Sequence, residues 1–250
     1  MEIAGLVAFG LIVFVGSYIQ AVTGFAMAMI IVAVVGGMRL LSIPELAATT
    51  SLLTILNVVL ALWGQWHHIY RPVFNWLALG QVPAIFLGFW VMTWLDSNLQ
   101  WVLELSLGLF ITIGGISMWL KPHPWANIAG PGASFATGIA GGIVGGMFSA
   151  SGPILGWFSY NQPLPLAAIR ATLLACFVLT TTTRTGIVIF EDQLTTDVLT
   201  FSAIGIPAVI VGTWLGRRFP PPITETGIKR VANGILLLMG SWILIRSALL

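Results

Sequence analysis

Two arginines in an otherwise apolar stretch are the side chains best suited to chemistry. Arg170 and Arg184 lie within residues 165–190, which are apolar enough to form a membrane-spanning helix. An ionisable residue at the centre of a bilayer costs about 2.5–3.5 kcal/mol, so it is a functional candidate by default. The arginines are 14 residues apart, and 14 steps of about 100° bring them to within about 40° of one helix face. A guanidinium presents paired planar donors, so this face is suited to binding an oxyanion.

Each arginine also has a structural interpretation. Arg170 could extend along the helix to reach the membrane interface. Arg184 could pair with Glu191 or Asp192, one to two turns later. The two arginines lie about 21 Å apart along a helix, so one small anion cannot touch both. That they mark successive stations on one path is a further hypothesis.

The composition places these residues in a membrane protein. The chain has 250 residues, of which 58% are hydrophobic and 7% charged, and its mean hydropathy is +0.99. Soluble domains contain about 25% charged residues. We therefore expect an all-α polytopic membrane protein whose main surroundings are the lipid bilayer. The net charge of +2 without a basic stripe argues against a nucleic-acid partner, and the single Cys176 excludes a cysteine-based metal site. No cofactor is expected.

The hydrophobic pattern predicts ten helical segments, joined by short loops. The second and seventh are too short to cross a bilayer, so we expect each to form a broken or re-entrant hairpin with the segment before it. The ten segments are residues 3–20, 24–37, 45–65, 72–95, 98–120, 133–148, 152–160, 165–190, 195–218 and 224–248.

The two halves of the chain resemble each other. Residues 83–90 read Pro-Ala-Ile-Phe-Leu-Gly-Phe-Trp, and residues 207–214 read Pro-Ala-Val-Ile-Val-Gly-Thr-Trp. Chance similarity between apolar stretches is the alternative, but the shared Pro-Ala-x-x-x-Gly-x-Trp pattern favours a duplication. We therefore predict two five-segment repeats, over residues 1–121 and 131–250.

Charge predicts that the two repeats are inverted. The loop after the third segment carries Arg71, whereas its counterpart around residues 191–197 is acidic. The loop after the fourth segment carries Asp96, whereas its counterpart carries Arg217 and Arg218. Because cytoplasmic loops are enriched in Lys and Arg, corresponding loops are expected on opposite sides of the membrane. Inverted repeats of this kind are a common transporter plan.

The same rule predicts the orientation in the inner (cell) membrane. Both termini are expected outside, and Arg39 and Arg246 then lie on the side that the rule disfavours. The cationic residues expected in the cytoplasm are Arg71, Lys121, Arg217, Arg218, Lys229 and Arg230.

Two motifs resemble those of the TauE/SafE family of membrane permeases. Residues 16–25 follow the pattern Gly-x-x-x-Gln-x-x-x-Gly-Phe and precede an apolar run that ends near Pro44. The Gly-rich residues 138–153 end in Ser-Gly-Pro and precede the Pro-x-Pro of residues 163–165. The resemblance covers essentially the whole chain. It implies transport of small sulfur-containing anions such as sulfite and organosulfonates, and it suggests protons as the coupling ion.

The hairpin tips are the predicted binding site. Small residues, hydroxyls and accessible backbone occur at Thr23 and Gly24 in the first half and at Ser151 and Gly152 in the second. Helix N-termini offer free N–H groups and a positive dipole end, which attract anions near the bilayer midplane. The alternative is that the glycines serve only close helix packing. Further donors are expected from Gln20, Ser149, Arg170 and Arg184.

A secondary transporter is the favoured function, and two other classes were weighed against it. An anion channel would need a continuous polar pathway, which the sequence does not display. An intramembrane enzyme would need a catalytic set at membrane depth, and neither paired carboxylates nor metal ligands occur there. Glu104 is the one carboxylate well inside a long segment, and it is either a proton-coupling group or a structural partner. The sequence does not indicate an oligomeric state.

Overall fold

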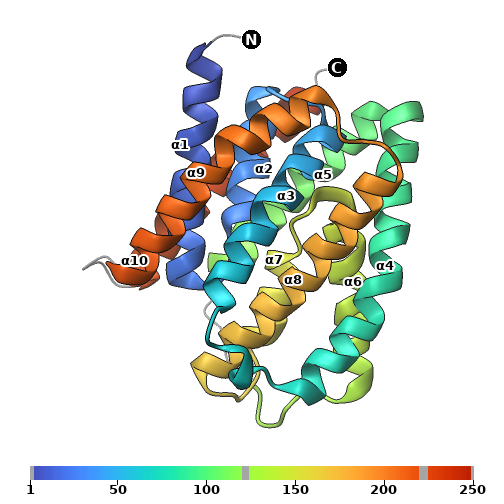
Figure 1. Cartoon of the computed structure of the whole chain (residues 1–250). Coiled ribbons are helices and arrows are strands. Elements are labelled where there is room, and N and C mark those ends of the chain that lie inside the picture. The colour runs from blue at the N-terminus through green and yellow to red at the C-terminus, as the bar shows by residue number, and fades with distance from the viewer. Residues whose placement is uncertain (1–2, 120–123, 220–224, 249–250) are drawn as a thin grey trace.

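The computed structural model describes residues 3–119, 124–219 and 225–248, and all of its regular elements are helices. Lys121, used above as a repeat boundary and as a cytoplasmic charge, lies outside these residues. The ten predicted segments are all present, each within three residues of its expected bounds (Figure 1). The helices are α1 (Ile3–Thr23), α2 (Met27–Met38), α3 (Ile43–Leu62), α4 (Arg71–Asn98), α5 (Gln100–Trp119), α6 (Pro131–Phe148), α7 (Gly152–Tyr160), α8 (Leu166–Phe190), α9 (Thr196–Arg218) and α10 (Glu225–Ala248), with a short 3₁₀ helix η1 (Trp66–His68) between α3 and α4.

Within the described residues, six helices are long and apolar enough to cross a membrane, namely α1, α3, α4, α5, α8 and α9. Their outer faces carry large exposed apolar side chains, as Leu79, Phe86 and Trp90 do along α4. A surface of this kind is stable against lipid tails and would aggregate in water. The all-α membrane fold expected from the composition is therefore confirmed.

The Gly-rich face of α6 lets this helix pack directly on the backbone of α4. A Cβ atom added at Gly138, Gly142 or Gly146 would collide with main-chain atoms of α4. The contact is reciprocal, because a Cβ at Gly80 or Gly88 would collide with main-chain atoms of α6. Such small-residue faces allow helices to approach closely where lipid provides no hydrophobic driving force.

Helices α1 and α9 repeat this arrangement on the other side of the bundle. Gly212 and Gly216 of α9 face backbone atoms of α1, including the carbonyl oxygens of Phe14 and Tyr18. In both cases, the first helix of one half packs against the fourth helix of the other half: α6 against α4, and α1 against α9. Helices α3 and α8, which occupy corresponding places in the two halves, pack against each other, as do α5 and α10.

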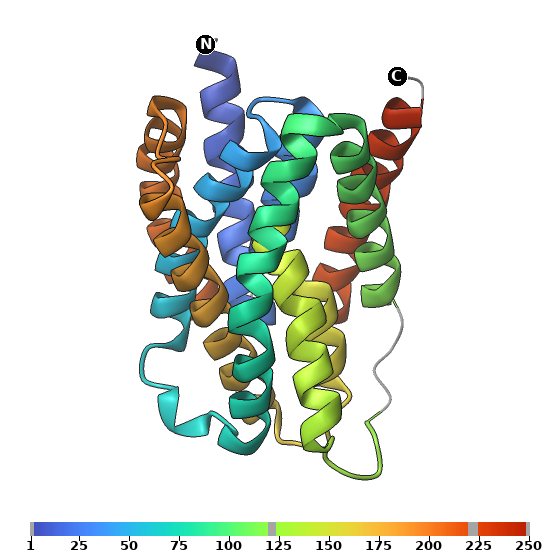
Figure 2. The same cartoon turned by 90° about the vertical axis from the view of Figure 1, so that its right-hand side faces the viewer.

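The two hairpins enter the bundle from opposite ends. In Figure 2, α1 begins and α2 ends at the upper end, whereas α6 begins and α7 ends at the lower end. The α3–α4 loop lies at the lower end, and the α8–α9 loop lies at the upper end (Figure 1). In each hairpin a longer helix precedes a shorter one, with 21 and 12 residues in the first and 18 and 9 in the second. The inverted repeat itself remains a prediction.

Candidate functional site

A small, partly enclosed cavity lies where the turns of the two hairpins meet helices α3 and α8. The space for the centres of water-sized molecules is about 20 Å³, which is enough for roughly one water. Most of the lining residues are small, and six of the eleven are polar. The lining residues are Gln20, Ala26, Ala28, Met29, Thr54, Ser149, Ser151, Gly152, Phe177, Thr180 and Thr181.

The first hairpin turns through backbone conformations that are rare for side-chain-bearing residues. Gly24 has φ +83°, and Ala26, the residue that precedes α2, has φ +103°. A left-handed conformation is easy for glycine and strained for alanine. Gln20 stabilises the turn by accepting a hydrogen bond from the backbone N–H of Met27 through Oε1, at 2.9 Å. The N-terminal end of α2 is thereby held at the cavity.

The second hairpin turns through Ser149, which has φ +58° and ends α6. Ser151 precedes α7, but its side chain makes no capping hydrogen bond. The backbone N–H of Gly152, at the N-terminal end of α7, is therefore not capped by the side chain of Ser151. Because α2 and α7 both begin at the cavity wall, the positive ends of two helix dipoles converge on it.

Three buried donor groups at the cavity have no hydrogen-bond partner among the described residues. They are Nε2 of Gln20, the hydroxyl of Thr54 and the hydroxyl of Ser151, on side chains no more than 3% exposed. An unpaired buried polar group costs about 1–3 kcal/mol. Of the twelve such atoms among the described residues, these three belong to residues that line one cavity. All three can donate a hydrogen bond. The cavity thus combines unused donors with positive helix ends, which is the chemistry of an anion site.

The hydroxyls of α8 at the cavity are already bonded. Thr180 donates to the carbonyl of Cys176 and accepts a hydrogen bond from Nε2 of Gln81. Thr181 donates to the carbonyl of Phe177 at 2.8 Å. These threonines complete the wall and leave the unpaired donors on the hairpins and on α3.

Arg184 lies just behind the cavity and is fully buried. Its Nε donates to the carbonyl of Gly146 at 2.9 Å, near the C-terminal end of α6, where a positive charge is favourable. Its Nη1 donates to Ser51 Oγ at 3.1 Å, and Ser51 Oγ lies 2.8 Å from Ser149 Oγ. The structural interpretation in which Arg184 pairs with Glu191 or Asp192 is wrong, because the guanidinium points inward to α6 and α3.

Arg170 lies beside the turn of the first hairpin and outside the cavity lining. A Cβ added at Gly24 would meet Arg170 Cγ at 3.3 Å and the hydroxyl oxygen of Tyr160 at 3.8 Å. Thr23 is buried here. Its hydroxyl oxygen lies within hydrogen-bond distance of the carbonyls of Ile19 and Phe25, and its own carbonyl accepts a hydrogen bond from the hydroxyl of Tyr160. The two arginines therefore lie on either side of the cavity, since Phe177 falls midway between them on α8.

The structure thus brings four of the eight predicted site residues into one cavity wall: Gln20, Ser149, Ser151 and Gly152. Thr23, Gly24, Arg170 and Arg184 lie next to that wall. Sequence reasoning missed Thr54 and Ser51 of α3. The signal was the run of hydroxyl residues 49–51 followed by Thr54, which is an unusual concentration of polar groups for a membrane helix.

The fold defines a polytopic helical membrane protein with a small polar cavity between two hairpins. The comparison with known families is specific: the chain belongs to the family described as sulfite exporter TauE/SafE, whose model matches residues 8–243. The family membership expected from the two motifs is therefore confirmed. The chain is 39% identical over 226 residues to a "Probable sulfite/organosulfonate exporter TauE" of Cupriavidus necator, covering 90% of this chain and 88% of that protein. No solved structure matches the chain.

Proposed function

We propose that this protein is a secondary transporter of sulfite or a small organosulfonate, and that the anion binds in the cavity between the hairpin tips. Family membership supports the transport of a sulfur oxyanion. The observation that carries the location is the set of three buried, unpaired donors on Gln20, Thr54 and Ser151. A bound oxyanion would accept from all three and repay the cost of leaving them unpaired.

In this proposal, some of the predicted site residues bind the anion directly and Arg184 acts at one remove. Gln20, Ser149, Ser151 and the backbone of Gly152 are direct ligands, together with Thr54. Arg184 is a positioning residue that acts through Ser51 and Ser149.

Hydrogen bonds link Arg184 to Ser149 through Ser51, and the Ser51 proton has two possible acceptors. Ser51 accepts from Arg184, and its single proton can go to the carbonyl of Ala47, 2.9 Å away, or to Ser149. When Ser51 donates to Ser149, the Ser149 proton is free to point at an anion. The charge of Arg184 then favours the anion through two hydroxyls without touching it.

Thr23, Gly24 and Arg170 form the approach to the cavity from the lower end of the bundle. Arg170 is half-buried beside the first hairpin turn. A guanidinium in this place attracts an anion and can hand it to the hairpin donors. Arg170 and the central cavity are therefore successive stations on one path.

A carrier fits the cavity better than a channel does. Room for about one water is too small for a sulfur oxyanion with four or more heavy atoms, so the hairpin tips must separate for binding. None of the described residues that line the cavity is a carboxylate. We therefore propose that a coupling proton travels on the substrate, as it does in bisulfite.

We also propose the inverted-repeat plan and the orientation given above, with domains over residues 1–121 and 131–250 and both termini outside the inner membrane. The exchanged pairing of α1 with α9 and of α6 with α4 supports the repeat. The opposite placement of the α3–α4 and α8–α9 loops supports the inversion (Figure 1). A pseudo-two-fold relation of this kind would let one half move against the other around the central cavity.

The test is the removal of unpaired hydroxyls. Thr54→Val keeps the shape of the side chain and deletes a hydroxyl that has no partner, so we expect equal or higher stability and about tenfold weaker binding of sulfite. Ser151→Ala should behave in the same way. Thr137→Val is the control, because the Thr137 hydroxyl bonds its own helix away from the cavity. Uptake of radiolabelled sulfite into proteoliposomes and thermal unfolding in detergent give the two readouts. Wild-type transport by both cavity variants would refute the proposed site.

A further inference from the structure

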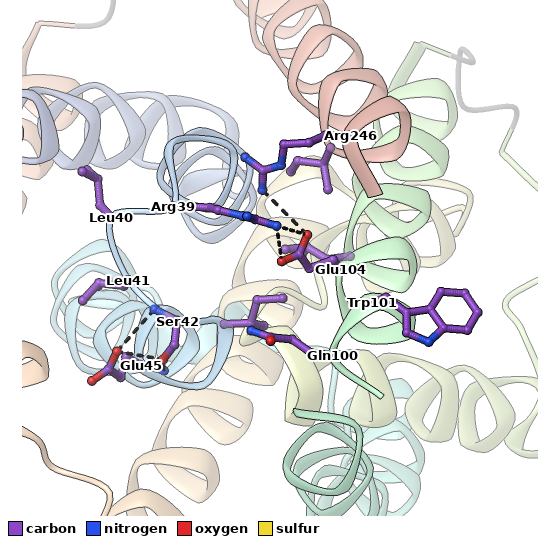
Figure 3. A pocket seen from close by; sticks show the side chains of 13 residues that line it. Arg39, Leu40, Leu41, Ser42, Glu45, Gln100, Trp101, Glu104 and Arg246 are labelled. Atoms are coloured by element: carbon purple, nitrogen blue, oxygen red, sulfur yellow. Dashed lines mark hydrogen bonds and ion pairs between the residues drawn. The ribbon is translucent and has the colours of Figure 1, made fainter. Parts of the chain in front are cut away.

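A second, larger cavity opens at the upper end of the bundle, where α2 ends and α5 begins. Its volume is about 510 Å³, within the range of small-molecule sites. Four charged side chains line it: Arg39, Glu45, Glu104 and Arg246. Figure 3 shows them around a common space, with Arg39 pointing across it to Glu104. We call it the Arg39–Arg246 cavity.

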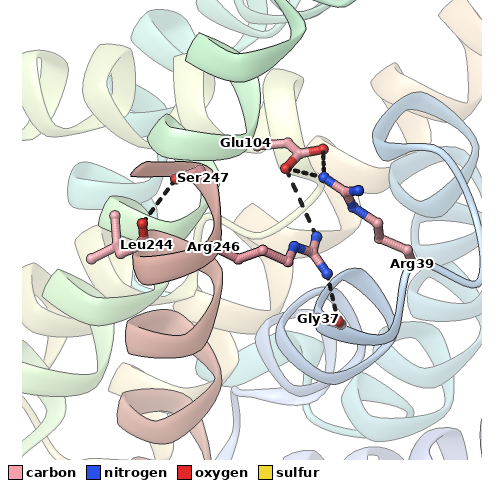
Figure 4. A network of polar contacts seen from close by, with 6 residues as sticks. All are labelled: Gly37, Arg39, Glu104, Leu244, Arg246 and Ser247. Carbon is pink, nitrogen blue, oxygen red and sulfur yellow. Dashed lines mark hydrogen bonds and ion pairs between the residues drawn. The ribbon is translucent and has the colours of Figure 1, made fainter. Parts of the chain in front are cut away.

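Two guanidinium groups here share one carboxylate. Arg39 Nη2 lies 2.6 Å from each oxygen of Glu104, and Arg246 Nη2 lies 3.8 Å from Glu104 Oε2 (Figure 4). Arg246 Nη1 also donates to the carbonyl of Gly37 at the C-terminal end of α2. These contacts tie α2, α5 and α10 together and give the cluster a formal excess of one positive charge.

The pairing leaves donors unused. Arg39 meets Glu104 through Nη2 alone, so its Nε–H and Nη1–H groups have no partner among the described residues. Arg246 Nε is buried and also lacks a hydrogen-bond partner in that part of the chain. An oxyanion pairs best with an arginine edge that offers two parallel N–H groups, and both such edges of Arg39 include Nη2, so paired binding requires the anion to displace Glu104 from that nitrogen.

The other acid that lines the cavity is already engaged. Glu45 accepts from the backbone N–H and the hydroxyl of Ser42 in a capping box at the start of α3. It also accepts from the hydroxyl of Thr195, at 3.0 Å. The carboxylate of Glu45 is therefore held by three neutral donors on its own side of the cavity. It keeps its negative charge, so the four charged side chains of the lining sum to zero, and Glu104 is the lining carboxylate in direct contact with the arginines.

We propose that the Arg39–Arg246 cavity is a second anion site, which binds a small sulfonate or sulfite through Arg39 and Arg246 in competition with Glu104. Its place on the path rests on the proposed function. Helix α2 has 12 residues and is about 18 Å long, with its N-terminal end at the central cavity and its C-terminal end here. An anion that leaves the central cavity toward the upper end would meet this site next.

The competition predicts changes of opposite sign. Arg39→Gln and Arg246→Gln should each weaken anion binding at this site by about three- to tenfold. Glu104→Gln should strengthen binding by a similar factor, because it releases both guanidinium groups. A cluster that only clamps three helices predicts no gain from Glu104→Gln. Arg71→Gln, an exposed cation at the other end of the bundle, is the matched control.

Isothermal titration of the full-length protein in detergent, with sulfite and with ethanesulfonate, tests this at two salt concentrations. We expect two binding events in the wild type, of which the one affected by Arg39→Gln weakens more in high salt because this cavity is open to solvent. Thr54→Val should weaken the other event. If Arg39→Gln, Arg246→Gln and Glu104→Gln all titrate as wild type while Thr54→Val loses binding, this inference is overturned and the central site stands. If Glu104→Gln weakens binding, the clamp explanation holds and the inference is overturned. If the wild type binds neither anion, both proposals fail.

Discussion

Ser149 allows the backbone and the hydroxyl at the second hairpin tip to be tested separately. Its φ of +58° is left-handed, which costs a non-glycine residue roughly 1 kcal/mol or slightly more. Its hydroxyl shares a hydrogen bond with Ser51 at 2.8 Å, worth about 1 kcal/mol. Ser149→Ala loses the hydrogen bond and keeps the strain. Ser149→Gly loses the hydrogen bond and relieves the strain, so it should be more stable than Ser149→Ala by about 1 kcal/mol.

Transport should not follow stability in this pair. Both variants lack the hydroxyl that we assign to the anion, and a hydrogen bond to a charged group is worth about 1.5–3 kcal/mol, or roughly 10- to 100-fold in affinity. We therefore expect both to transport sulfite with a strongly raised KM in proteoliposomes. Ser97→Ala, on an exposed turn of α4, is the control. Wild-type KM in Ser149→Gly would refute the ligand role. Equal unfolding temperatures for the two variants would refute the strain argument.

Two further predictions concern packing and topology. Gly142→Ala should lower the unfolding temperature markedly, because its Cβ would meet the Gln81 carbonyl and lie 2.7 Å from Ala84 Cβ, whereas Gly132→Ala, with open space around it, should unfold as wild type. Reporter enzymes fused within the loop at residues 191–197 should read outside the cell, and a cytoplasmic signal there would contradict the inverted orientation.

The helices could be predicted because each has a local cause in the sequence. Apolar runs of sufficient length predict spans, and turn residues limit them. The largest differences between the predicted and observed helix bounds have local causes too. The first helix continues past Gln20 to Thr23, because the Thr23 hydroxyl bonds the carbonyl of Ile19 and the N–H of Gly24 bonds the carbonyl of Gln20. The third helix begins at Ile43 because Ser42 and Glu45 form a capping box.

The candidate site could be predicted only in part, because its main feature is a set of polar side chains without hydrogen-bond partners, and only the folded structure shows which side chains these are. Thr54 and Thr181 are both hydroxyls on membrane helices, and such groups usually bond the carbonyl four residues earlier. Thr181 does so, whereas Thr54 has no partner among the described residues. Arg184 shows the same limit. Its helix face was predicted, but its partners, Gly146 and Ser51, come from other helices.

Arg39 and Arg246, the two cations that argued against the predicted orientation, share a physical explanation. The positive-inside rule counts Lys and Arg near the ends of membrane spans. Both arginines converge on the carboxylate of Glu104, and Arg246 also meets the C-terminal end of α2. Arg217, by contrast, donates to the carbonyls of Leu60 and Trp63 at the end of α3, and no acidic side chain among the described residues pairs with it. Glu104 offsets one of the two positive charges of Arg39 and Arg246, so the pair counts as one net cation against the predicted orientation. They are also the side chains that we assign to a second anion site, and Glu104→Gln tests that assignment directly.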